Sequence, residues 1–442
     1  MTAVSDAPLK NPAVTVIGGG LAGSEAALVL AGRGITVRLI DRKPGSMTPA
    51  HSDKRLGELV CSNSLKSDDP ATAGGLLKAE LRLLKSPLIA LADTCRVPAG
   101  SALAVDRDMF AQRVTDAVDA APYILRESAY AEDWDADAYT VIATGPLTDG
   151  GLLKKLTARA GKALHFYDAA APILSGACID RSRCFTADRY GKGTGDYLNC
   201  PMTKEEYRVF YEALVSAKRA ELKAFERSEI FEGCMPIEIM AARGYDTLRF
   251  GPMRPVGFVY PDGKRPAAVA QLRRENAAGD MYNLVGFQTN LTYPEQRRVF
   301  SLIPALGDIE ILRYGVMHRN SYLSAPDALD ACSRLKACPK TWVAGQLSGV
   351  EGYVESILSG HLAARHLVDT IEGRTPVPLP EVCLSGALPR YLAAPNPHFR
   401  PMNANFGILP PLEKRVRDKR ANQQQYAQRS LSKLKVVLNV LT

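Results

Sequence analysis

The chain has 442 residues, 46% of them hydrophobic, and a formal net charge of +8. Its length predicts two or three domains, and its composition excludes a disordered or collagen-like chain. No apolar run approaches the roughly 18 residues of a membrane span, and Met1 to Lys10 lack the layout of a secretory signal, so we expect a cytoplasmic protein without membrane contact.

The first element predicted along the chain is a β-α-β unit. Ala13 to Ile17 is a short, β-branched apolar run that predicts a buried strand, and Ser24 to Ala31 is predicted as a helix. Gly32 to Gly34 ends this helix. Ile35 to Ile40 then predicts a second strand, which ends at Asp41.

The turn inside this unit carries the pattern Gly18-x-Gly20-x-x-Gly23. The first glycine permits a tight turn, the second lets the backbone approach a pyrophosphate, and the third lets helix and strand pack closely. A diphosphate would lie at the helix N-terminus, and the Asp41 carboxylate would accept hydrogen bonds from ribose hydroxyls. The pattern predicts a dinucleotide, FAD or NAD(P), and the predicted contacts are Gly18, Gly19, Gly20, Leu21, Ala22, Gly23 and Asp41.

Two more strands run into glycine turns. Val141 to Pro146 contains Gly145, and the segment after Trp342 contains Gly345 and Gly349. Each is more often a purely structural turn when taken alone. Together they favour FAD over NAD(P), because a long flavin cofactor is enclosed by several loops. Gly145, Gly345 and Gly349 are therefore added to the predicted contacts.

The middle of the chain has a different character. Residues 166–330 mix strand-like runs, such as Asn283 to Gln288, with helical ones, such as Lys204 to Phe225. A helix is predicted again from Val354 to Ile371. The predicted fold class is α/β: a Rossmann-like FAD-binding domain in two parts, with an inserted α+β domain. The predicted segments are 11–165 and 331–410 for the first, 166–330 for the second, and 411–442 for a basic tail.

The tail holds most of the net charge. Pro411 to Thr442 contains eight basic and two acidic residues, which is +6 of the total +8. Four leucines at spacings of three and four (431, 434, 438 and 441) predict one apolar stripe of a helix docked on the body. Arg429 and Lys433 would face outward. Such a face attracts a polyanion such as nucleic acid, although it is also typical of a merely solvated helix.

The nine cysteines indicate reduced thiols, because their number is odd and no secretion signal accompanies them. Their spacing does not indicate a metal site. Cys61 and Cys234 lie among small polar residues and glycine, which is compatible with catalysis, although a buried inert cysteine is more common. His51 and His318 are candidates for an acid, a base or a substrate contact, or for a structural role.

A series of longer motifs follows in order along the chain. They are Gly18–Gly23, Thr48–His51, Glu58–Ser64, Val97–Arg107, Tyr167–Pro172, Tyr197–Thr203, Phe231–Pro236, Phe250–Gly257, Val285–Thr289, Tyr314–Asn320, Gly349–Ser356 and Pro401–Gly407. With these motifs the chain resembles the bacterial folate- and FAD-dependent tRNA (uracil-5-)-methyltransferases, TrmFO, from about residue 13 to 415.

The resemblance implies a reaction and its participants. A methylene group from methylenetetrahydrofolate would pass by way of FAD to C5 of uridine 54 in the tRNA T loop, with NADH or NADPH as reductant. Uracil C5 becomes nucleophilic only after a group such as a thiolate adds at C6, and a base must later remove the C5 proton. The resemblance places the family's two cysteines at Cys234, expected as the nucleophile, and Cys61, expected as the acid/base or protective partner. The T-arm of tRNA is the expected macromolecular partner, and no obligatory protein partner is inferred.

A few residues depart from the family pattern. Asp41 to Pro44 replaces a more usual Glu-Met-Arg-Pro but keeps the carboxylate. Ala50 to Lys54 is about one residue shorter than in the family, and Leu56-Gly57 replaces Phe-Ala.

Three other functions stay open. They are the same chemistry on ribosomal RNA, a wobble-uridine enzyme of the glucose-inhibited-division type, and a tRNA-binding folding factor.

Overall fold

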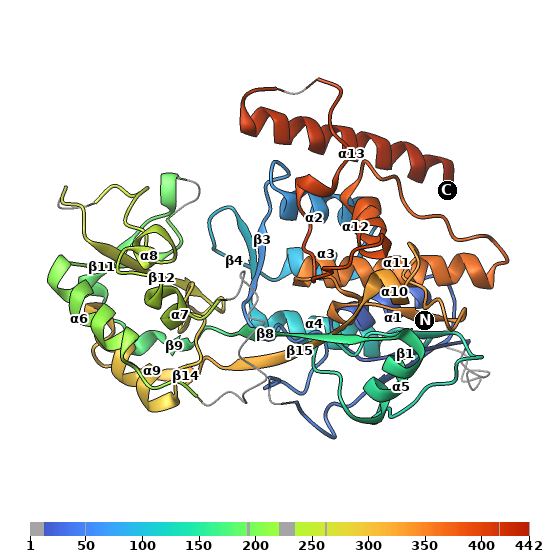
Figure 1. The fold of residues 1–442 in the computed structure, drawn as a ribbon, viewed down its shortest axis with the longest axis horizontal. Helices are drawn as coiled ribbons and strands as arrows, with labels where there is room; N and C mark the ends of the chain where they lie inside the picture. The colour runs from blue at the N-terminus through green and yellow to red at the C-terminus, as the bar shows by residue number, and fades with distance from the viewer. Residues whose placement is uncertain are drawn as a thin grey trace, which may run out of the picture.

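The computed structural model describes residues 13–48, 50–191, 195–220, 235–260, 263–414 and 416–441. Within them the chain forms two lobes, each with its own sheet and hydrophobic core. Strands β8 (Ala163–Ala169) and β15 (Met317–Leu323) pair antiparallel and run side by side from one lobe towards the other (Figure 1).

The first lobe is built on a five-stranded parallel sheet in the order β16-β7-β1-β2-β6. Its strands are β1 (Val14–Ile17), β2 (Val37–Asp41), β6 (Ile124–Ser128), β7 (Thr140–Ile142) and β16 (Thr341–Val343). Strand β16 comes from a distant part of the chain and pairs with β7, so the chain returns to this sheet after forming the second lobe. The predicted α/β, Rossmann-like class is confirmed.

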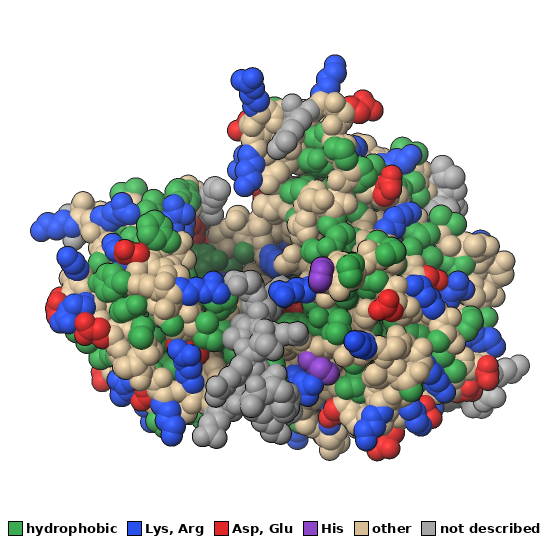
Figure 2. All heavy atoms as spheres, viewed as in Figure 1, with side chains coloured by type: hydrophobic (Ala, Val, Ile, Leu, Met, Phe, Trp, Pro, Cys, Tyr) green, Lys and Arg blue, Asp and Glu red, His purple; other side chains and the backbone are tan. Residues whose placement is uncertain are grey.

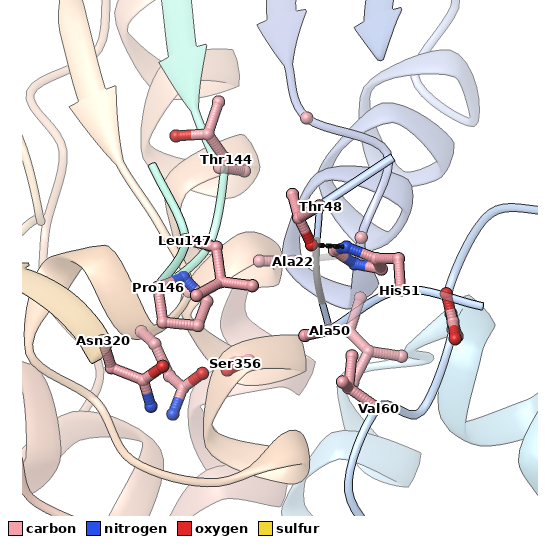
Figure 3. A pocket seen from close by; sticks show the side chains of 18 of the residues that line it. Ala22, Thr48, Ala50, His51, Val60, Thr144, Pro146, Leu147, Asn320 and Ser356 are labelled. Atoms are coloured by element: carbon pink, nitrogen blue, oxygen red, sulfur yellow. Dashed lines mark hydrogen bonds between the residues drawn. The ribbon is translucent and has the colours of Figure 1, made fainter. Parts of the chain in front are cut away.

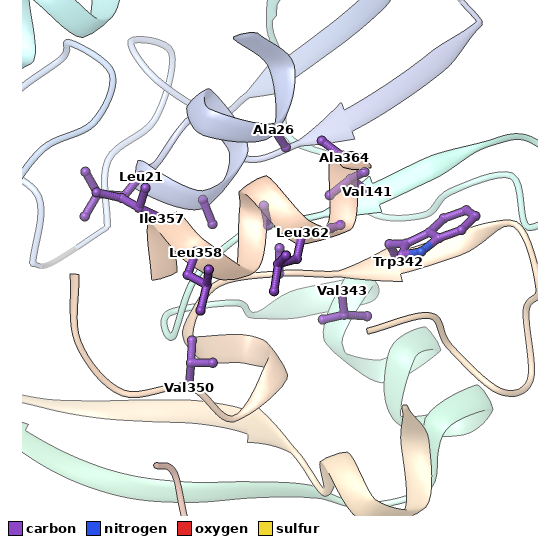
Figure 4. Packing of buried hydrophobic residues seen from close by; sticks show 14 of the residues in the cluster. Leu21, Ala26, Val141, Trp342, Val343, Val350, Ile357, Leu358, Leu362 and Ala364 are labelled. Atoms are coloured by element: carbon purple, nitrogen blue, oxygen red, sulfur yellow. The ribbon is translucent and has the colours of Figure 1, made fainter. Parts of the chain in front are cut away.

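Two helices pack closely on this sheet. Helix α1 (Leu21–Ala31) connects β1 to β2, and α11 (Tyr353–Ile371) lies against it. A Cβ added at Gly360 would stand 2.1 Å from the Ala22 carbonyl oxygen, so only glycine permits this approach. Figure 4 shows side chains of both helices meeting Trp342 and Val343 of β16 in one core.

The remaining elements of the first lobe extend this core. A small antiparallel sheet consists of β3 (Ser64–Ser67), β5 (Ala102–Val105) and β4 (Arg96–Val97). The other long helices are α2 (Ala73–Leu83), α3 (Pro87–Thr94), α4 (Arg107–Asp119), α5 (Gly150–Ala160) and α12 (Leu384–Ala393).

The second lobe is a six-stranded sheet in the order β10-β11-β12-β13-β9-β14, with antiparallel neighbours. The strands are β9 (Ile173–Ser175), β10 (Phe185–Thr186), β11 (Leu198–Met202), β12 (Ala268–Arg274), β13 (Met281–Leu284) and β14 (Ile311–Arg313). Helices of this lobe include α6 (Lys204–Val215), α7 (Ile237–Ala242), α8 (Thr247–Phe250) and α9 (Tyr293–Phe300).

Two sequence predictions in this lobe are wrong in their boundaries. The strand expected at Asn283 to Gln288 starts at Met281 and ends at Leu284, because Gly286 adopts a φ of +80° that turns the chain. The helix expected from Lys204 to Phe225 starts at Lys204 but ends at Val215, and residues 221–225 lie outside the described part of the chain.

The C-terminal segment forms helix α13 (Lys419–Leu441), which packs on α2 of the first lobe. Leu434 is buried in this contact and Lys433 is exposed, as the apolar stripe predicted. Arg429, expected to face outward, instead donates hydrogen bonds to the carbonyl oxygens of Pro410 and Pro411. Among the described residues, we find no helix that combines the length and the apolar character of a membrane span.

Candidate functional site

A cavity of about 450 Å³ opens where the parallel strands β1, β2, β7 and β16 end (Figure 3). Ligands of α/β sheets bind at this edge, because the strand ends and the following helix N-termini present unpaired backbone groups there. Seven of the ten predicted nucleotide contacts line the cavity: Gly18, Gly20, Leu21, Ala22, Asp41, Gly145 and Gly345. Gly19, Gly23 and Gly349 do not.

The three glycines of the first motif differ in what surrounds them. Gly18 has a φ of +104°, and a Cβ there would stand 2.4 Å from the Ala143 carbonyl oxygen. A Cβ at Gly23 would stand 1.7 Å from the Gly18 carbonyl oxygen, so this glycine lets helix α1 approach strand β1. A Cβ at Gly20 would meet no heavy atom within 4 Å. Gly20 therefore leaves free space beside the N-terminus of α1, a kind of position that attracts anions.

Asp41 is fixed by the backbone around it. The Gly19 N–H donates to its Oδ2 at 2.5 Å and the Lys43 N–H to its Oδ1 at 2.8 Å. The carboxylate is buried yet lines the cavity at the end of β2. This is a suitable position for accepting hydrogen bonds from ribose hydroxyls. Gly19, which does not line the cavity, thus belongs to the site through its contact with Asp41.

The other two glycine turns differ from each other. Gly145 has a φ of +75° with open space at its Cβ position, so the turn after β7 leaves room for a ligand. Gly345 (φ +72°) follows β16 and donates its N–H to the Ser359 hydroxyl. A Cβ on Gly349 would stand 2.6 Å from the Phe399 ring, so Gly349 serves packing away from the cavity.

Cys61 lines the same cavity and its thiol lies 3.8 Å from the Ala169 carbonyl oxygen. The N–H groups of Cys61 and Ser62 donate to the Tyr353 hydroxyl, at 2.7 and 3.1 Å. Burial, with the nearby Asp168 carboxylate, raises the pKa of the Cys61 thiol to about 12. Cys61 is therefore a neutral thiol in this state, able to hold a proton.

The second lobe holds the loop that carries Cys61. The Arg273 guanidinium of β12 donates to the Ser62 hydroxyl at 2.7 Å and to Asn63 Oδ1 at 2.9 Å. Arg107 donates to the Leu59 carbonyl oxygen and forms a buried ion pair with Glu275 at 2.7 Å. Cys61 thus lies where the two lobes meet, and both lobes determine its position.

Cys234 lies outside the described residues. Of its motif, the structure describes Met235 and Pro236, which precede helix α7.

Both candidate histidines line the cavity. Burial lowers the pKa of His51, whose Nδ1 lies 2.5 Å from the Thr48 hydroxyl (Figure 3). Burial, with Arg313 and His51 nearby, lowers the pKa of His318 to about 4. Each ring is therefore neutral at pH 7 and can donate or accept one hydrogen bond at each nitrogen.

Sequence reasoning gave no role to several cavity residues. Asp168 is one of them: it pairs across β8 and β15 with the candidate His318, so the ladder brings both to the cavity. Burial, with Asp168 next in effect, raises the pKa of Glu351 to about 8, and Gln346 donates to its Oε2 at 2.7 Å. These residues and Tyr353 lie within or beside recognised motifs, but only the fold brings them together.

The chain is similar to known proteins both in sequence and in fold. The sequence model of the family "Glucose inhibited division protein A" matches residues 13–375. The chain is 50% identical, over 96% of its length and 98% of the relative's, to the methylenetetrahydrofolate–tRNA-(uracil-5-)-methyltransferase TrmFO of Acetivibrio thermocellus. It is 51% identical to the same-named protein of Moorella thermoacetica, over 95% of this chain and 96% of the relative. The solved structure of Aquifex aeolicus GidA is similar in fold, with a TM-score of 0.67 and 16% identity over 97% of this chain and 74% of that one.

Proposed function

The chain belongs to the TrmFO family of methylenetetrahydrofolate–tRNA-(uracil-5-)-methyltransferases, and we propose that it methylates C5 of uridine 54 in the tRNA T loop. The observation that carries this proposal is the 50% identity to a TrmFO protein over 96% of the chain. The similarity to GidA at 16% identity concerns the fold alone, so it does not favour a wobble-uridine activity.

The cavity supports FAD as the resident cofactor. Gly20 leaves space for the diphosphate beside helix α1, and Gly145 leaves space at the turn after β7. The Asp41 carboxylate lines the cavity, where it can accept hydrogen bonds from a ribose. When bound, FAD supplies the redox chemistry that links methylenetetrahydrofolate to uracil. We propose that NADH or NADPH provides the reducing electrons.

The two cysteines have different proposed tasks. A nucleophilic cysteine attacks as a thiolate, whereas the pKa of Cys61 is raised to about 12, which favours a proton-carrying role for this thiol. We therefore propose that Cys61 is the acid/base group: once it has given up its own proton, its strongly basic thiolate accepts the C5 proton of uracil. Cys234, from the second cysteine motif, is the proposed nucleophile that adds to uracil C6.

The loop contacts support this division of tasks. Tyr353 accepts the N–H groups of Cys61 and Ser62, while Arg107 and Arg273 hold the residues on either side. A thiol held by its backbone in this way keeps its direction when substrates enter, and orientation is a large part of catalytic rate.

The experiment is mass spectrometry of nucleosides from tRNA incubated with the protein, methylenetetrahydrofolate and a reduced nicotinamide. We expect 5-methyluridine in tRNA with uridine at position 54 and none in a transcript with cytidine there. A ribosomal RNA transcript is the parallel substrate. Methylation of that RNA and not of tRNA would overturn the proposal, as would modification of the wobble uridine alone.

Variants of the cysteines test the proposed tasks. Cys61→Ser should lower the methylation rate by about 100-fold or more, since general acid–base groups contribute roughly that much. Cys95→Ser, at a buried cysteine away from the cavity, is the matched control and should keep the activity. Cys234→Ala should abolish methylation. Methylation retained in Cys234→Ala would contradict its proposed role as nucleophile, whereas a biological role kept without methylation would favour the folding-factor alternative.

A further inference from the structure

The second lobe contains two cysteines that face each other across a strand pair. The Sγ atoms of Cys184 and Cys200 are 3.6 Å apart. Cys200 lies in β11, and Cys184 directly precedes β10. Both belong to the second lobe, away from the residues that line the nucleotide cavity.

The strand register explains why these two thiols meet. Phe185 pairs with Asn199, so the next position outward places Cys184 opposite Cys200. The Ala187 N–H donates to the Tyr197 carbonyl oxygen, and alternation along an antiparallel pair then makes the cysteine positions a non-hydrogen-bonded pair. The Cα atoms of such a pair are closest, at about 4.5 Å, which is within the range of disulfides.

We propose that Cys184 and Cys200 form a reversible disulfide, which makes this strand pair a redox modification site. The S–S bond needs about 2.05 Å between sulfur atoms that are now hydrogen-bonded, so rotation of the side chains with a small adjustment of the backbone is enough. All eight cysteines that the structure describes are free thiols, so the structure represents the reduced form of this pair.

The two thiols differ in the way that stepwise oxidation requires. Cys184 is half-buried, whereas Cys200 is completely buried. The hydrogen bond between them lowers the pKa of Cys184 and, together with burial, raises the pKa of Cys200. Cys184 is therefore the thiol that an external oxidant reaches first, and Cys200 is the resolving thiol.

The oxidant is a low-molecular-weight disulfide such as oxidised glutathione. The Cys184 thiolate attacks one sulfur of that disulfide, forms a mixed disulfide and releases the first small thiol. The Cys200 thiolate then attacks the Cys184 sulfur and releases the second. Two S–H bonds of the protein are lost and one S–S bond forms, while the small disulfide is reduced to two thiols that carry both protons.

The bond would close a loop that touches the first lobe. Between the two cysteines, Asp196 accepts the Gly100 N–H at 2.7 Å and the Tyr197 hydroxyl donates to the Ala99 carbonyl oxygen at 3.4 Å. Closing the base of this loop restricts the unfolded chain and so stabilises the folded protein.

The test treats the purified, flavin-loaded protein with oxidised glutathione, alkylates the remaining thiols and maps the peptides without reduction. We expect a Cys184–Cys200 cross-linked peptide, lighter by two hydrogen atoms, that dithiothreitol reverses. The melting temperature should rise on oxidation by a few degrees, as expected for a constraint of this size. The flavin absorbance should stay unchanged.

Two single variants separate the steps. Cys184→Ser should give no cross-link and no rise in melting temperature, whereas Cys200→Ser should retain one glutathionyl group on Cys184. Cys332→Ser, at another half-buried cysteine, is the matched control and should oxidise like the parent protein. The proposal is overturned if the parent protein carries only a mixed disulfide at Cys184, or keeps both thiols free.

Discussion

Gly20 is the residue whose surroundings most directly point to a ligand. Its φ of −74° suits any L-amino acid, and no atom lies within 4 Å of its Cβ position, so neither backbone strain nor packing requires glycine. Gly18 and Gly23, by contrast, are each required by a neighbouring carbonyl oxygen. The empty space at Gly20 is what a diphosphate would occupy.

Gly20→Leu should therefore fold but bind FAD at least tenfold more weakly, because the new side chain fills the space proposed for the diphosphate. The flavin absorbance of the purified protein and a titration with added FAD measure this. Gly307→Leu is the matched control, since this glycine of the second lobe also has open space and ordinary helical dihedral angles. Full flavin content in Gly20→Leu would contradict the proposed position of the diphosphate.

The sequence was sufficient to indicate the glycines and Asp41, because short spacings in a β-α-β unit determine where such residues lie, whereas Cys61 was indicated by its motif and the family resemblance. It was not sufficient for Tyr353 or Arg107, which reach the Cys61 loop only through the fold. Tyr353 is 292 positions away from Cys61 in sequence, and no local pattern specifies a contact over that separation.

At the scale of elements, helix α11 is held by a buried histidine. His366 is completely buried, and its Nδ1 lies 3.0 Å from the Cys332 carbonyl oxygen, to which the neutral ring donates. Burial lowers the pKa of His366 from 6.5 to about 4. In the unfolded chain, His366 therefore binds a proton below pH 6.5. In the folded chain, it binds this proton only below about pH 4.

This histidine should make the free energy of unfolding fall by roughly 3 kcal/mol between pH 6.5 and pH 4, and contribute no pH dependence above pH 6.5. His366→Gln should remove that part of the dependence, so its stability relative to the parent improves as the pH falls. Urea unfolding at a series of pH values measures the difference. The exposed His398→Gln is the control, and a constant difference for His366→Gln would show that the ring protonates in the folded state.

Element boundaries show where local patterns stop being informative. The parallel strands β1 and β2 were predicted to within two residues at each end, since both are short apolar runs bounded by glycine or charge. Helix α6 starts as predicted because Thr203 and Glu206 form a capping box, but its end at Val215 has no comparable signal in sequence. Tertiary packing determines that end.

At the scale of the whole molecule, a few long-range polar contacts join the lobes. The ion pair of Arg107 with Glu275, whose side chains are 12% and 1% exposed, is largely buried and links α4 to the end of β12, beside the Cys61 loop. A buried pair of this kind costs desolvation and adds little net stability, but it specifies one relative position of its partners. The sequence indicated two domains. Their mutual placement depends on long-range contacts of this kind, which no periodic sequence pattern predicts.

The basic tail is also a feature of the whole molecule, because it packs on the first lobe and exposes its charge (Figure 2). Ser430 of α13 donates to the buried Glu80 at 2.6 Å, and the same carboxylate accepts the Leu384 and Ser385 N–H groups of α12. Helix α13 is thus tied to α2 and α12 by its buried face. Deleting it would expose this face, so the role of its charge is better tested by substitution.

Lys433 and Lys435 are exposed on α13, and phosphates that they contact would release counterions on binding. The double variant Lys433→Gln/Lys435→Gln should bind tRNA more weakly and lower the slope of log K against log salt by about one unit per lost contact. Lys154→Gln/Lys155→Gln, on α5 on the opposite side of the first lobe, removes the same charge and should leave the slope unchanged (Figure 1). Equal slopes for the first variant and the parent protein would show that this face of α13 is solvated and makes no contact with RNA.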